Sequence, residues 1–427
     1  MKLSKHKLGE LIEVTRGASL SGQFYAEKGE LIRLTLGNFN MNGGGFKENT
    51  SKTNLYYTGT VKDEFILNKG DIITPLTEQS LGLLGTTARI PESGKYIQSQ
   101  DVALVKCKEG LLDPNFCYYL ISSSVVRQQL SAGAQQTKIR HTSPDKIKDC
   151  TAWVPELEVQ KRIGRILYDI DEKIALNRQI NDNLEAMAKQ LYDYWFVQFD
   201  FPNEEGKPYK SSGGAMVWNE RLKREIPIDW TCCSIKEMCD INKKTINKDE
   251  HKQIEYLDTG SITQGHISNT EIYSVDMAPS RAQRKVEDLS ILYSSVRPRL
   301  LHYGILSTPK ENFIVSTGFV TLDAKCKKMA LMVYYFLTSN TITEHLASIA
   351  DTAVSSYPSI SPDDIAYLDI VIPSNDIIQK YNDIVEPMFR KMSTLRKEID
   401  SLTKQRDELL PLLMNGQASV NYHLSAY

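Results

Sequence analysis

Several short motifs contain residue types that could do chemistry on nucleic acid. The tetrapeptide from Asp113 to Phe116 (DPNF) is close to the D-P-P-Y motif of amino-methyltransferases, but Asn115 stands in place of the second proline. Asp followed by Pro is also a common helix start, because the carboxylate accepts free backbone N–H groups and proline fits the first turn. We therefore interpret this tetrapeptide as a helix cap rather than a catalytic motif.

Motifs for cofactors, phosphates and metals are also incomplete. The run N-G-G-G-F-K lacks the spacing and context of an S-adenosylmethionine loop, and Gly94-Lys95 is followed by Tyr96 where a phosphate-binding loop needs Ser or Thr. A nuclease-like pairing of Asp145 with Asp171 would place the second acid on a predicted helix instead of a strand. The seven histidines are scattered, without the spacing of metal ligands. We expect no catalytic residue, no metal site and no cofactor bound by this chain.

Polar and basic side chains in loops offer different chemistry, because Arg, Lys, Asn and Gln can read base edges and bind phosphates. The segment from Arg281 to Arg299 has five Lys or Arg against two acids, in a chain of formal net charge −2. The candidates for DNA contact are Arg16, Asn38, Asn40, Gln79, Lys138 and Arg140 in the first half of the chain, and Lys243, Lys244, Gln264, His266, Arg297 and Arg299 in the second.

The sequence that contains these candidates is an internal repeat of two similar copies. The stretch CYYLISSSVVRQQL from Cys117 matches VYYFLTSNTITEHL from Val333, and Pro144 and Pro155 recur 218 residues later as Pro362 and Pro373. Upstream the match is weaker, at an offset of about 220. A repeat of this length indicates two homologous domains rather than a solenoid.

Each copy predicts the same order of elements. Short β-rich runs (97–105 and 313–322) precede a helix (115–132 and 329–349), and a Ser-Pro loop and a strand ending before or at proline follow. A long helix closes each copy. The predicted domains are 1–155 and 229–374, with a central helix at 156–200, an exposed connector at 201–228, and a C-terminal helix and tail at 375–427.

The long helices carry heptad patterns. In the first, Ile163, Ile170, Asn177, Leu184 and Leu191 lie seven apart, with Ile166, Ile180, Met187 and Tyr194 as the expected complementary column and Trp195 at the end. In the second, Tyr381, Met388, Leu395, Leu402 and Leu409 lie seven apart, with Val385, Met392, Ile399 and Leu413 beside them. We expect an antiparallel coiled coil that also docks other subunits, with Asn177 setting its register. Pro387 should kink or start the second helix. The alternative is that each helix lies on its own domain.

Composition restricts the class of protein. The chain has 427 residues, of which 41% are hydrophobic and 24% charged, as in globular proteins with two or three domains. Seven cysteines without a C-x-x-C pair favour a reducing compartment. The charged start and the short apolar runs predict neither a signal peptide nor a membrane span. We expect a cytoplasmic protein.

The chain resembles the specificity subunit of type I restriction-modification systems. The resemblance lies in WVPELEVQKRIGRIL, NLEAMAKQLYDYWFVQFDFP, IPIDW and LTKQRDELLPLLMNGQ, and it spans the whole chain. It implies an α+β fold in which two homologous α/β target-recognition domains are separated by two long helices that pair as an antiparallel coiled coil. It further implies a non-catalytic subunit that recognises a bipartite sequence of double-stranded DNA.

The resemblance also implies partners. Two methyltransferase (modification) subunits would dock on the helices, restriction subunits would join through the complex, and S-adenosylmethionine, ATP and magnesium would be bound by those partners. The second copy departs from the pattern, because DIIQKYNDI replaces the segment that contains Gln160, Lys161 and Arg162. Two alternatives are a stand-alone DNA-binding protein such as a repressor, and a restriction enzyme with its own catalytic site, which the missing motifs disfavour.

Overall fold

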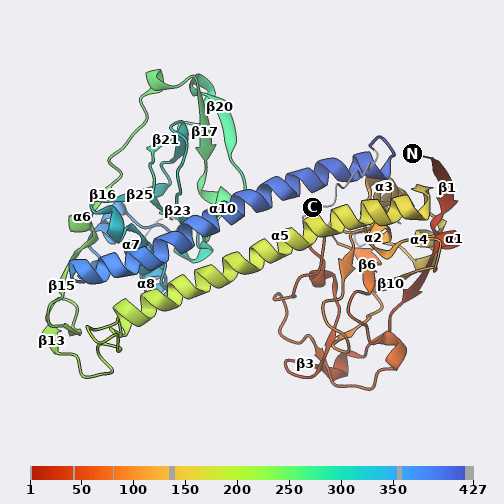
Figure 1. Ribbon diagram of the computed structural model, residues 1–427, viewed down its shortest axis with the longest axis horizontal. Coiled ribbons are helices and arrows are strands. Elements are labelled where there is room, and N and C mark those ends of the chain that lie inside the picture. The colour runs from red at the N-terminus through yellow and green to blue at the C-terminus, as the bar shows by residue number, and fades with distance from the viewer. Residues whose placement is uncertain (1, 42–43, 80, 134–139, 353–357, 419–427) are drawn as a thin grey trace. The chain divides into compact units, whose positions relative to one another are not determined.

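The chain divides into two compact units. The computed structural model describes all residues except 1, 42–43, 80, 134–139, 353–357 and 419–427. Unit 1 comprises Met1–Arg178 and Lys397–Tyr427, and unit 2 comprises Gln179–Arg396. Both boundaries fall inside long helices, which are yellow-green and blue in Figure 1. Each unit therefore consists of one globular part and a segment of each long helix.

A four-stranded antiparallel sheet, in the order β2-β10-β6-β8, forms the centre of unit 1. Its strands are β2 (Ile12–Arg16), β10 (Val102–Cys107), β6 (Ile72–Pro75) and β8 (Ala88–Arg89). Alternate side chains point to opposite faces of a strand, so Ile72 packs with the helices while Ile73 packs with a second sheet. That sheet contains β3 (Tyr25–Ala26), β5 (Tyr56–Tyr57), β4 (Leu31–Arg33) and β9 (Tyr96–Ile97).

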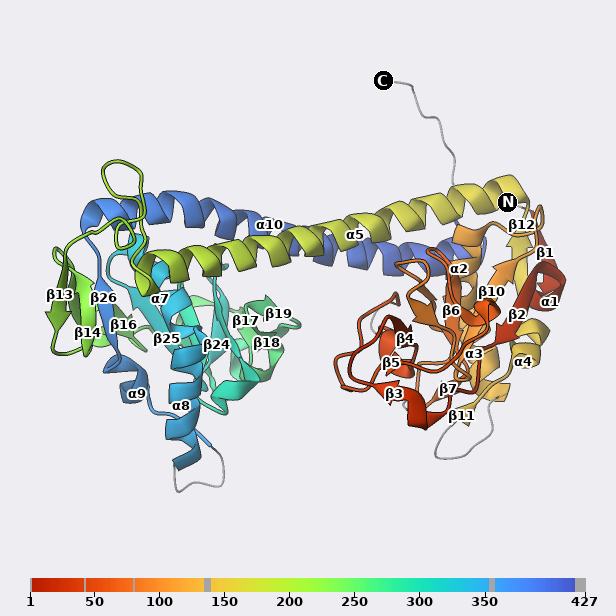
Figure 2. The same ribbon diagram turned by 90° about the horizontal axis from the view of Figure 1, so that it is seen from below.

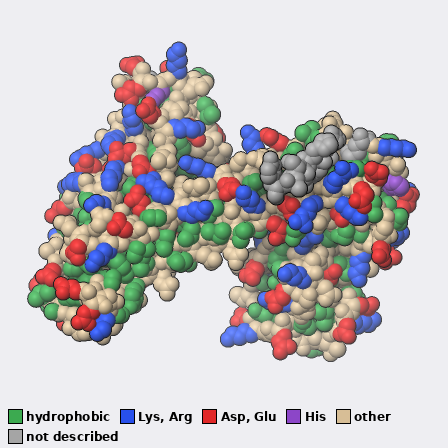
Figure 3. Space-filling view, viewed as in Figure 1, with side chains coloured by type: hydrophobic (Ala, Val, Ile, Leu, Met, Phe, Trp, Pro, Cys, Tyr) green, Lys and Arg blue, Asp and Glu red, His purple; other side chains and the backbone are tan. Residues whose placement is uncertain are grey.

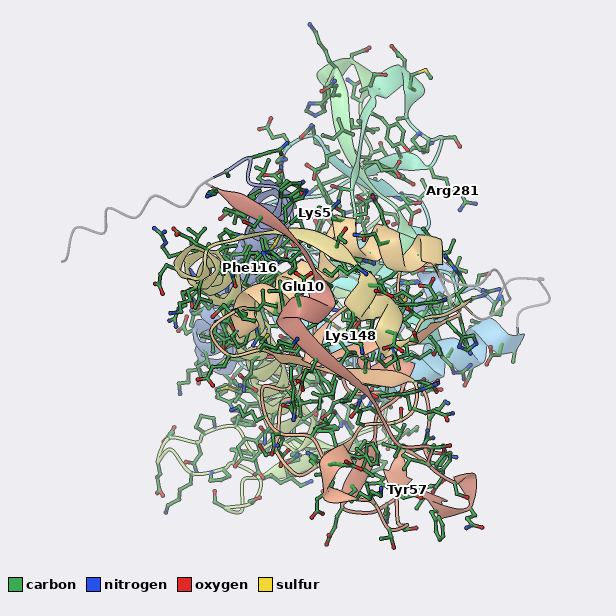
Figure 4. All side chains as sticks on the ribbon, turned by 90° about the vertical axis from the view of Figure 1, so that its right-hand side faces the viewer. Lys5, Glu10, Tyr57, Phe116, Lys148 and Arg281 are labelled. Carbon is green, nitrogen blue, oxygen red and sulfur yellow. The ribbon has the colours of Figure 1, made fainter. Side chains whose placement is uncertain are left out.

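The two ends of the first globular part are joined by β1 (Leu3–Lys7), which pairs with β12 (Thr151–Pro155). In Figure 4, Lys5, Glu10 and Lys148 mark β1, α1 (Leu8–Leu11) and α4 (Pro144–Asp149) at this place. The helix α2 (Pro114–Ser122) begins as predicted, because the Asp113 carboxylate accepts the Phe116 N–H at 2.9 Å.

The helix expected over 115–132 is interrupted. It consists of α2 and α3 (Ser124–Gly133), and they meet at the buried Ser123, whose hydroxyl donates to the Leu120 carbonyl at 2.7 Å. A serine that bonds the preceding turn competes with the helical pattern, which explains the break. The helix expected over 329–349 is likewise divided into α7 (Ala330–Leu337) and α8 (Asn340–Thr352).

Unit 2 repeats this architecture. The strand β15 (Thr231–Ser234) pairs with β26 (Asp369–Ile372), and α6 (Ile235–Met238) and α9 (Pro362–Ala366) lie where α1 and α4 lie in unit 1. The central sheet contains β16 (Cys239–Ile241), β25 (Phe319–Ala324), β22 (Ile291–Ser294) and β23 (Tyr303–Ile305). The second sheet contains β20 (Glu271–Ser274), β17 (Gln253–Leu257), β24 (Phe313–Ser316) and β21 (Ala282–Lys285). The order of elements confirms the internal repeat.

The long helices are α5 (Leu157–Tyr192) and α10 (Asn375–Met414), and Figure 2 shows them from a second side. The prediction that Pro387 starts the second helix is wrong, since α10 begins at Asn375 and continues through Pro387. The proline ring is exposed, while Val385 and Phe389 on either side are buried. Burial on both sides of the proline offsets the backbone hydrogen bond that it cannot donate.

The connector after α5 is not exposed throughout. Phe199 and Phe201 are buried, and the Phe201 ring stacks on Tyr209 at 4.7 Å and on Trp230 at 4.8 Å between centroids. Aromatic rings interleaved with Gly, Pro and Ser therefore anchor the start of the connector in unit 2. The hairpin of β13 (Met216–Asn219) and β14 (Arg224–Pro227) follows it.

Candidate nucleic-acid interface

In unit 2 a hairpin and a loop bring four predicted residues together. The hairpin of β18 (Ile262–Thr263) and β19 (His266–Ile267) carries Gln264 and His266, and the loop between β22 and β23 carries Arg297 and Arg299. The Gln264 N–H donates to the Leu301 carbonyl at 2.9 Å, and the Gly265 N–H donates to the Tyr303 carbonyl at 2.7 Å. These backbone bonds join the hairpin to the loop.

Unusual backbone angles shape this part of unit 2. Gln264, Arg297 and Leu301 adopt φ values of 47°, 47° and 57°, in the left-handed region that side chains other than glycine rarely occupy. The side chains of Gln264, His266, Arg297 and Arg299 are exposed. Strained backbone that displays exposed polar groups is typical of a binding site.

The long helix α10 forms a side-chain hydrogen bond with the turn of the hairpin. Arg396 donates from Nη1 to the Gly265 carbonyl at 2.8 Å and from Nη2 to Glu185 of α5 at 3.2 Å. Gly265 has φ +75°, and a Cβ there would lie 3.3 Å from Nη1 of Arg396. The hairpin thus rests directly on the helix segments of unit 2.

Arg299 is engaged in ion pairs on α8. Its guanidinium lies 2.6 Å from a carboxylate oxygen of Asp351 and 3.1 Å from one of Glu344. Hydrogen bonds to these carboxylates raise the pKa of Arg299. The group is half exposed, so a phosphate could replace either carboxylate without a buried charge being left unpaired.

Lys243 and Lys244 follow β16 at a different place in unit 2. Lys243 is paired with Asp240, and Lys244 is paired with Glu287 and lies 3.5 Å from Asp323. Partial burial lowers the pKa of Lys244, but the hydrogen bond to Glu287 and the charge of Asp323 outweigh it and raise the pKa. Arg16 is the last residue of the equivalent strand β2 of unit 1, and its Nε donates to the Gln100 carbonyl at 2.8 Å.

Unit 1 contains the corresponding hairpin and loop. The Asn40 N–H donates to the Gly45 carbonyl at 3.0 Å, and the Gly45 N–H donates to the Thr87 carbonyl at 2.9 Å. Thr87 lies at the end of the loop that carries Gln79. Gln79 is exposed, and Asn40 is half-buried. Asn40 and Gln79 thus correspond in place to the hairpin and loop residues of unit 2.

A buried carboxylate, which our sequence analysis did not single out, shapes the loop of unit 1. Glu78 is 2% exposed, and its Oε2 accepts the N–H groups of Gly82, Leu83 and Leu84 at 3.0–3.1 Å. Its Oε1 lies 3.2 Å from Nη1 of Arg140, where β7 (Thr77–Glu78) pairs with β11 (Arg140–His141). Arg140 therefore stabilises the conformation of the loop through Glu78. The sequence signal that could have identified Glu78 is an acidic residue between two polar ones, Thr77 and Gln79.

Two further candidates, Asn38 and Lys138, are not among the exposed residues that the structure describes. Asn38 is 2% exposed and caps a turn, where its Oδ1 accepts the Thr35 N–H at 2.9 Å and its Nδ2 donates to the Lys47 carbonyl at 3.2 Å. We withdraw it as a DNA contact, because a turn cap and a base reader have the same residue type in sequence. Lys138 lies outside the described residues.

The helix segments pack antiparallel within each unit. In unit 1, Ile163 and Leu167 of α5 pack with Leu413 and Met414 of α10, and Arg406 lies 2.9 Å from Asp171. In unit 2, Ala188 and Trp195 belong to the same buried cluster as Tyr381, Phe389 and Met392. Of the predicted positions, Ile163, Trp195 and Leu395 are buried, and the others are half-buried: Ile170, Leu184, Leu191, Met388, Leu402 and Leu409.

The complementary column that we predicted for α5 is wrong. Met187 and Tyr194 are 51% and 36% exposed, and the buried column consists of Leu167, Ile174, Asn181, Ala188 and Trp195. Positions three and four residues after a seam residue both neighbour it on a helix. The buried column could not be recognised from the sequence, because two of its members, Asn181 and Ala188, are not strongly apolar. The column predicted for α10 was correct, with Arg406 at its one unassigned position.

The face shown in Figure 3 has lysine and arginine side chains interspersed with acidic ones over the globular part of each unit. Arg281, in the locally basic segment of unit 2, is exposed and points away from the ribbon (Figure 4). The described residues include no group of three or more His, Cys, Asp or Glu placed to hold a metal ion. Within the described part of the chain, no helix is long and apolar enough to cross a membrane.

A protein-family model for the type I restriction modification DNA specificity domain matches residues 2–186 and 227–404. The chain belongs to this family. The two matched segments are the two copies of the repeat, so this specificity subunit contains two specificity domains, each with its own hairpin, loop and long helix. The predicted family and the α+β fold with two homologous domains and antiparallel helices are confirmed.

Relatives of this specificity subunit include two from Methanocaldococcus jannaschii. The type I restriction enzyme MjaIX specificity subunit is 24% identical over 323 residues, which are 73% of this chain and 71% of that protein. The MjaVIII specificity subunit is 23% identical over 376 residues, covering 84% and 81%. The crystal structure of the type I restriction-modification S subunit from M. genitalium aligns with a TM-score of 0.63 at 18% identity, over 97% of this chain and 96% of that one. That likeness supports the fold.

Proposed function

We propose that this specificity subunit reads an asymmetric, bipartite sequence in double-stranded DNA, with the hairpin and loop of each unit reading one half. The observation that carries the proposal is that both units present the same two backbone elements with different side chains. Asn40 and Gln79 occupy them in unit 1, whereas Gln264 and Arg297 occupy them in unit 2. Direct readout depends on the donors and acceptors that a protein presents, so unlike side chains favour unlike half-sites.

We further propose that the chain has no catalytic activity and positions two methyltransferase subunits, to which restriction subunits attach. S-adenosylmethionine, ATP and magnesium would then be bound by those partners. An open groove of about 590 Å³ in unit 1, lined by α5 residues such as Lys161, Arg165 and Ile166, supports docking on this helix. Met187 in unit 2 is an exposed apolar residue of the same helix. Exposed apolar groups on a long helix fit a protein partner better than DNA, which favours the complex over a stand-alone repressor.

Sequence selection and a methyl-transfer assay test the proposal. The full-length chain is incubated with a library of random duplexes, and bound DNA is sequenced. We expect a motif with two specified parts separated by an unspecified spacer. The chain alone should transfer no label from S-adenosylmethionine to the selected duplex. A single continuous motif would contradict the bipartite reading, and methylation without added subunits would contradict the non-catalytic assignment.

Replacement of residues 1–150 with those of another family member separates the two readers. We expect one half of the selected motif to change and the other half to stay the same. A chimera in which both halves changed together would show that the units do not read DNA independently. The open reading frames beside the gene distinguish the repressor alternative, since a partner methyltransferase would carry an N-P-P-F or N-P-P-Y motif.

A further inference from the structure

Each of the two reading loops presents a leucine to solvent. In unit 1, Leu81 lies between Gln79 and Gly82 and is 76% exposed. In unit 2, Leu300 follows Arg299 and is 49% exposed. Single exposed leucines are common on protein surfaces and need no explanation. Here, however, both copies of the repeat place one in the same loop of the central sheet, between β6 and β8 in unit 1 and between β22 and β23 in unit 2.

The loop around Leu81 is held firmly. Glu78 accepts three successive N–H groups that begin at Gly82, and Nη2 of Arg127 donates to the Gly82 carbonyl. Gly82 has φ +101°, which turns the chain directly after Leu81. The neighbouring Leu83 and Leu84 are buried, so the same loop directs two leucines into the core and one outward.

In the loop around Leu300, different backbone contacts also leave the leucine exposed. Residues Pro298–Leu300 form a 3-10 turn, and the Arg297 N–H donates to the Pro358 carbonyl at 2.9 Å. Leu301, the residue after Leu300, is left-handed with φ +57° and packs partly into the core. Leucine rarely adopts a left-handed backbone, and here this unfavourable conformation accompanies a turn that leaves Leu300 exposed.

We propose that Leu81 and Leu300 are apolar DNA contacts, each of which packs against a base pair of the half-site that its unit reads. The inference rests on the proposed function. Two contacts share this chemistry: van der Waals packing on the C5-methyl group of a thymine, and insertion between neighbouring bases. Either one buries an exposed side chain and adds specificity that the polar neighbours Gln79 and Arg297 do not supply.

The test uses the full-length chain and the duplex that it selects from a random library. We expect Leu81→Ala and Leu300→Ala each to weaken binding about tenfold, since each variant removes most of the apolar area that the leucine would bury against DNA. Each variant should relax only its own half-site. Leu81→Met, which keeps an apolar side chain of similar volume, should retain most of the affinity. Leu111→Ala in unit 1 and Ile228→Ala in unit 2 are matched controls, because these side chains are 49% and 57% exposed outside both loops.

Three readouts distinguish a base contact from an effect on loop structure. The slope of affinity against salt concentration should match that of the parent, because no phosphate contact is lost. Replacement of thymine by deoxyuridine in one half-site should weaken the parent but not the matching alanine variant if the methyl group is the contact. Increased 2-aminopurine fluorescence with the parent alone would instead identify insertion between bases.

The outcomes separate this inference from the proposed function. A chain that selects no DNA sequence would overturn both. A chain that selects a bipartite site, but whose two leucine variants bind it as the parent and the controls do, would overturn the inference alone. So would a tenfold loss in which neither the deoxyuridine duplex nor the 2-aminopurine duplex distinguishes parent from variant, because the leucine would then act only on its loop.

Discussion

The helix seams of the two units use different chemistry at positions that the repeat makes equivalent. In unit 1, Arg406 of α10 pairs with Asp171 of α5 at 2.9 Å, and Asp171 also accepts the Tyr119 hydroxyl at 2.6 Å. An offset of 218 maps Arg406 and Asp171 onto Ala188 and Phe389, which are 0% and 4% exposed in the main cluster of unit 2. One unit thus has an ion pair where the other has an apolar pair.

The difference shows which property each seam provides. A buried ion pair contributes little net stability, because both charges lose hydration, but it opposes any pairing that separates them. An apolar pair stabilises through burial and constrains the register of the helices less. At this pair of positions unit 1 therefore opposes a misaligned pairing of α5 and α10, whereas unit 2 gains stability from burial.

Phe389→Ala should have the largest effect on this comparison. Removal of a buried ring leaves a cavity, and we expect unit 2 to lose about 4 kcal/mol of stability. Amide hydrogen exchange measured along α10 should show lost protection in the segment that belongs to unit 2. Ile384→Ala is the matched control, since this side chain is 41% exposed on the same helix. Equal losses for the two variants would mean that the apolar seam does not stabilise unit 2.

Arg406→Ala should follow, with a loss of about 3 kcal/mol in unit 1, because Asp171 keeps a charge without its partner. The double variant Arg406→Met and Asp171→Asn should recover most of that loss, since asparagine is neutral and can still accept the Tyr119 hydroxyl. Denaturant unfolding of both variants measures the difference. Lys404→Ala, at a position 77% exposed, serves as the control. A double variant as unstable as Arg406→Ala would contradict the proposed role of the charge.

The turn before β6 in unit 1 and the equivalent turn before β22 in unit 2 offer a further comparison of the two units. Gly70 in unit 1 has φ +89°, and a Cβ added there would meet nothing within 4 Å, while the equivalent Leu289 in unit 2 has φ +67° and is buried. Gly70→Ala should destabilise unit 1 by about 1–2 kcal/mol through backbone strain alone. Gly133→Ala, at an open position without positive φ, should be neutral or stabilising. Thermal unfolding would refute the argument if both variants behaved alike.

The smallest expected effect concerns Asp288, which ties the turn of unit 2 to α10. Its hydrogen bonds with Arg390 at 2.6 Å hold the pKa of its carboxyl below the ordinary value of 3.8, although partial burial opposes this. A depressed pKa stabilises the fold at neutral pH and loses that contribution as the pH falls through it. Asp288→Asn should cost less than about 1 kcal/mol at pH 7, since the pair is partly exposed. The difference from the parent should shrink between about pH 5 and pH 2, and an unchanged difference would contradict this assignment.

Sequence patterns predicted the features that depend on residues near one another in the chain. The cap at Asp113 and the heptad columns of α10 follow from spacings of a few residues, and the internal repeat follows from the likeness of two continuous segments; the structure confirms all three. Periodicity failed in α5, where Asn181 and Ala188 occupy seam positions that look polar or neutral in sequence. The alternation of residue types identifies a face only when its members are strongly apolar.

The sequence by itself determined the family, the repeat and the two long helices, because each is encoded in local periodicity or in a motif. Only the tertiary structure decided which polar residues are displayed. It buried Asn38 in a turn, used Arg140 to hold a loop, and set Gly265 on Arg396, 131 residues away. The same residue types serve as caps, supports and readers, so their roles depend on contacts between distant segments, which no local pattern contains.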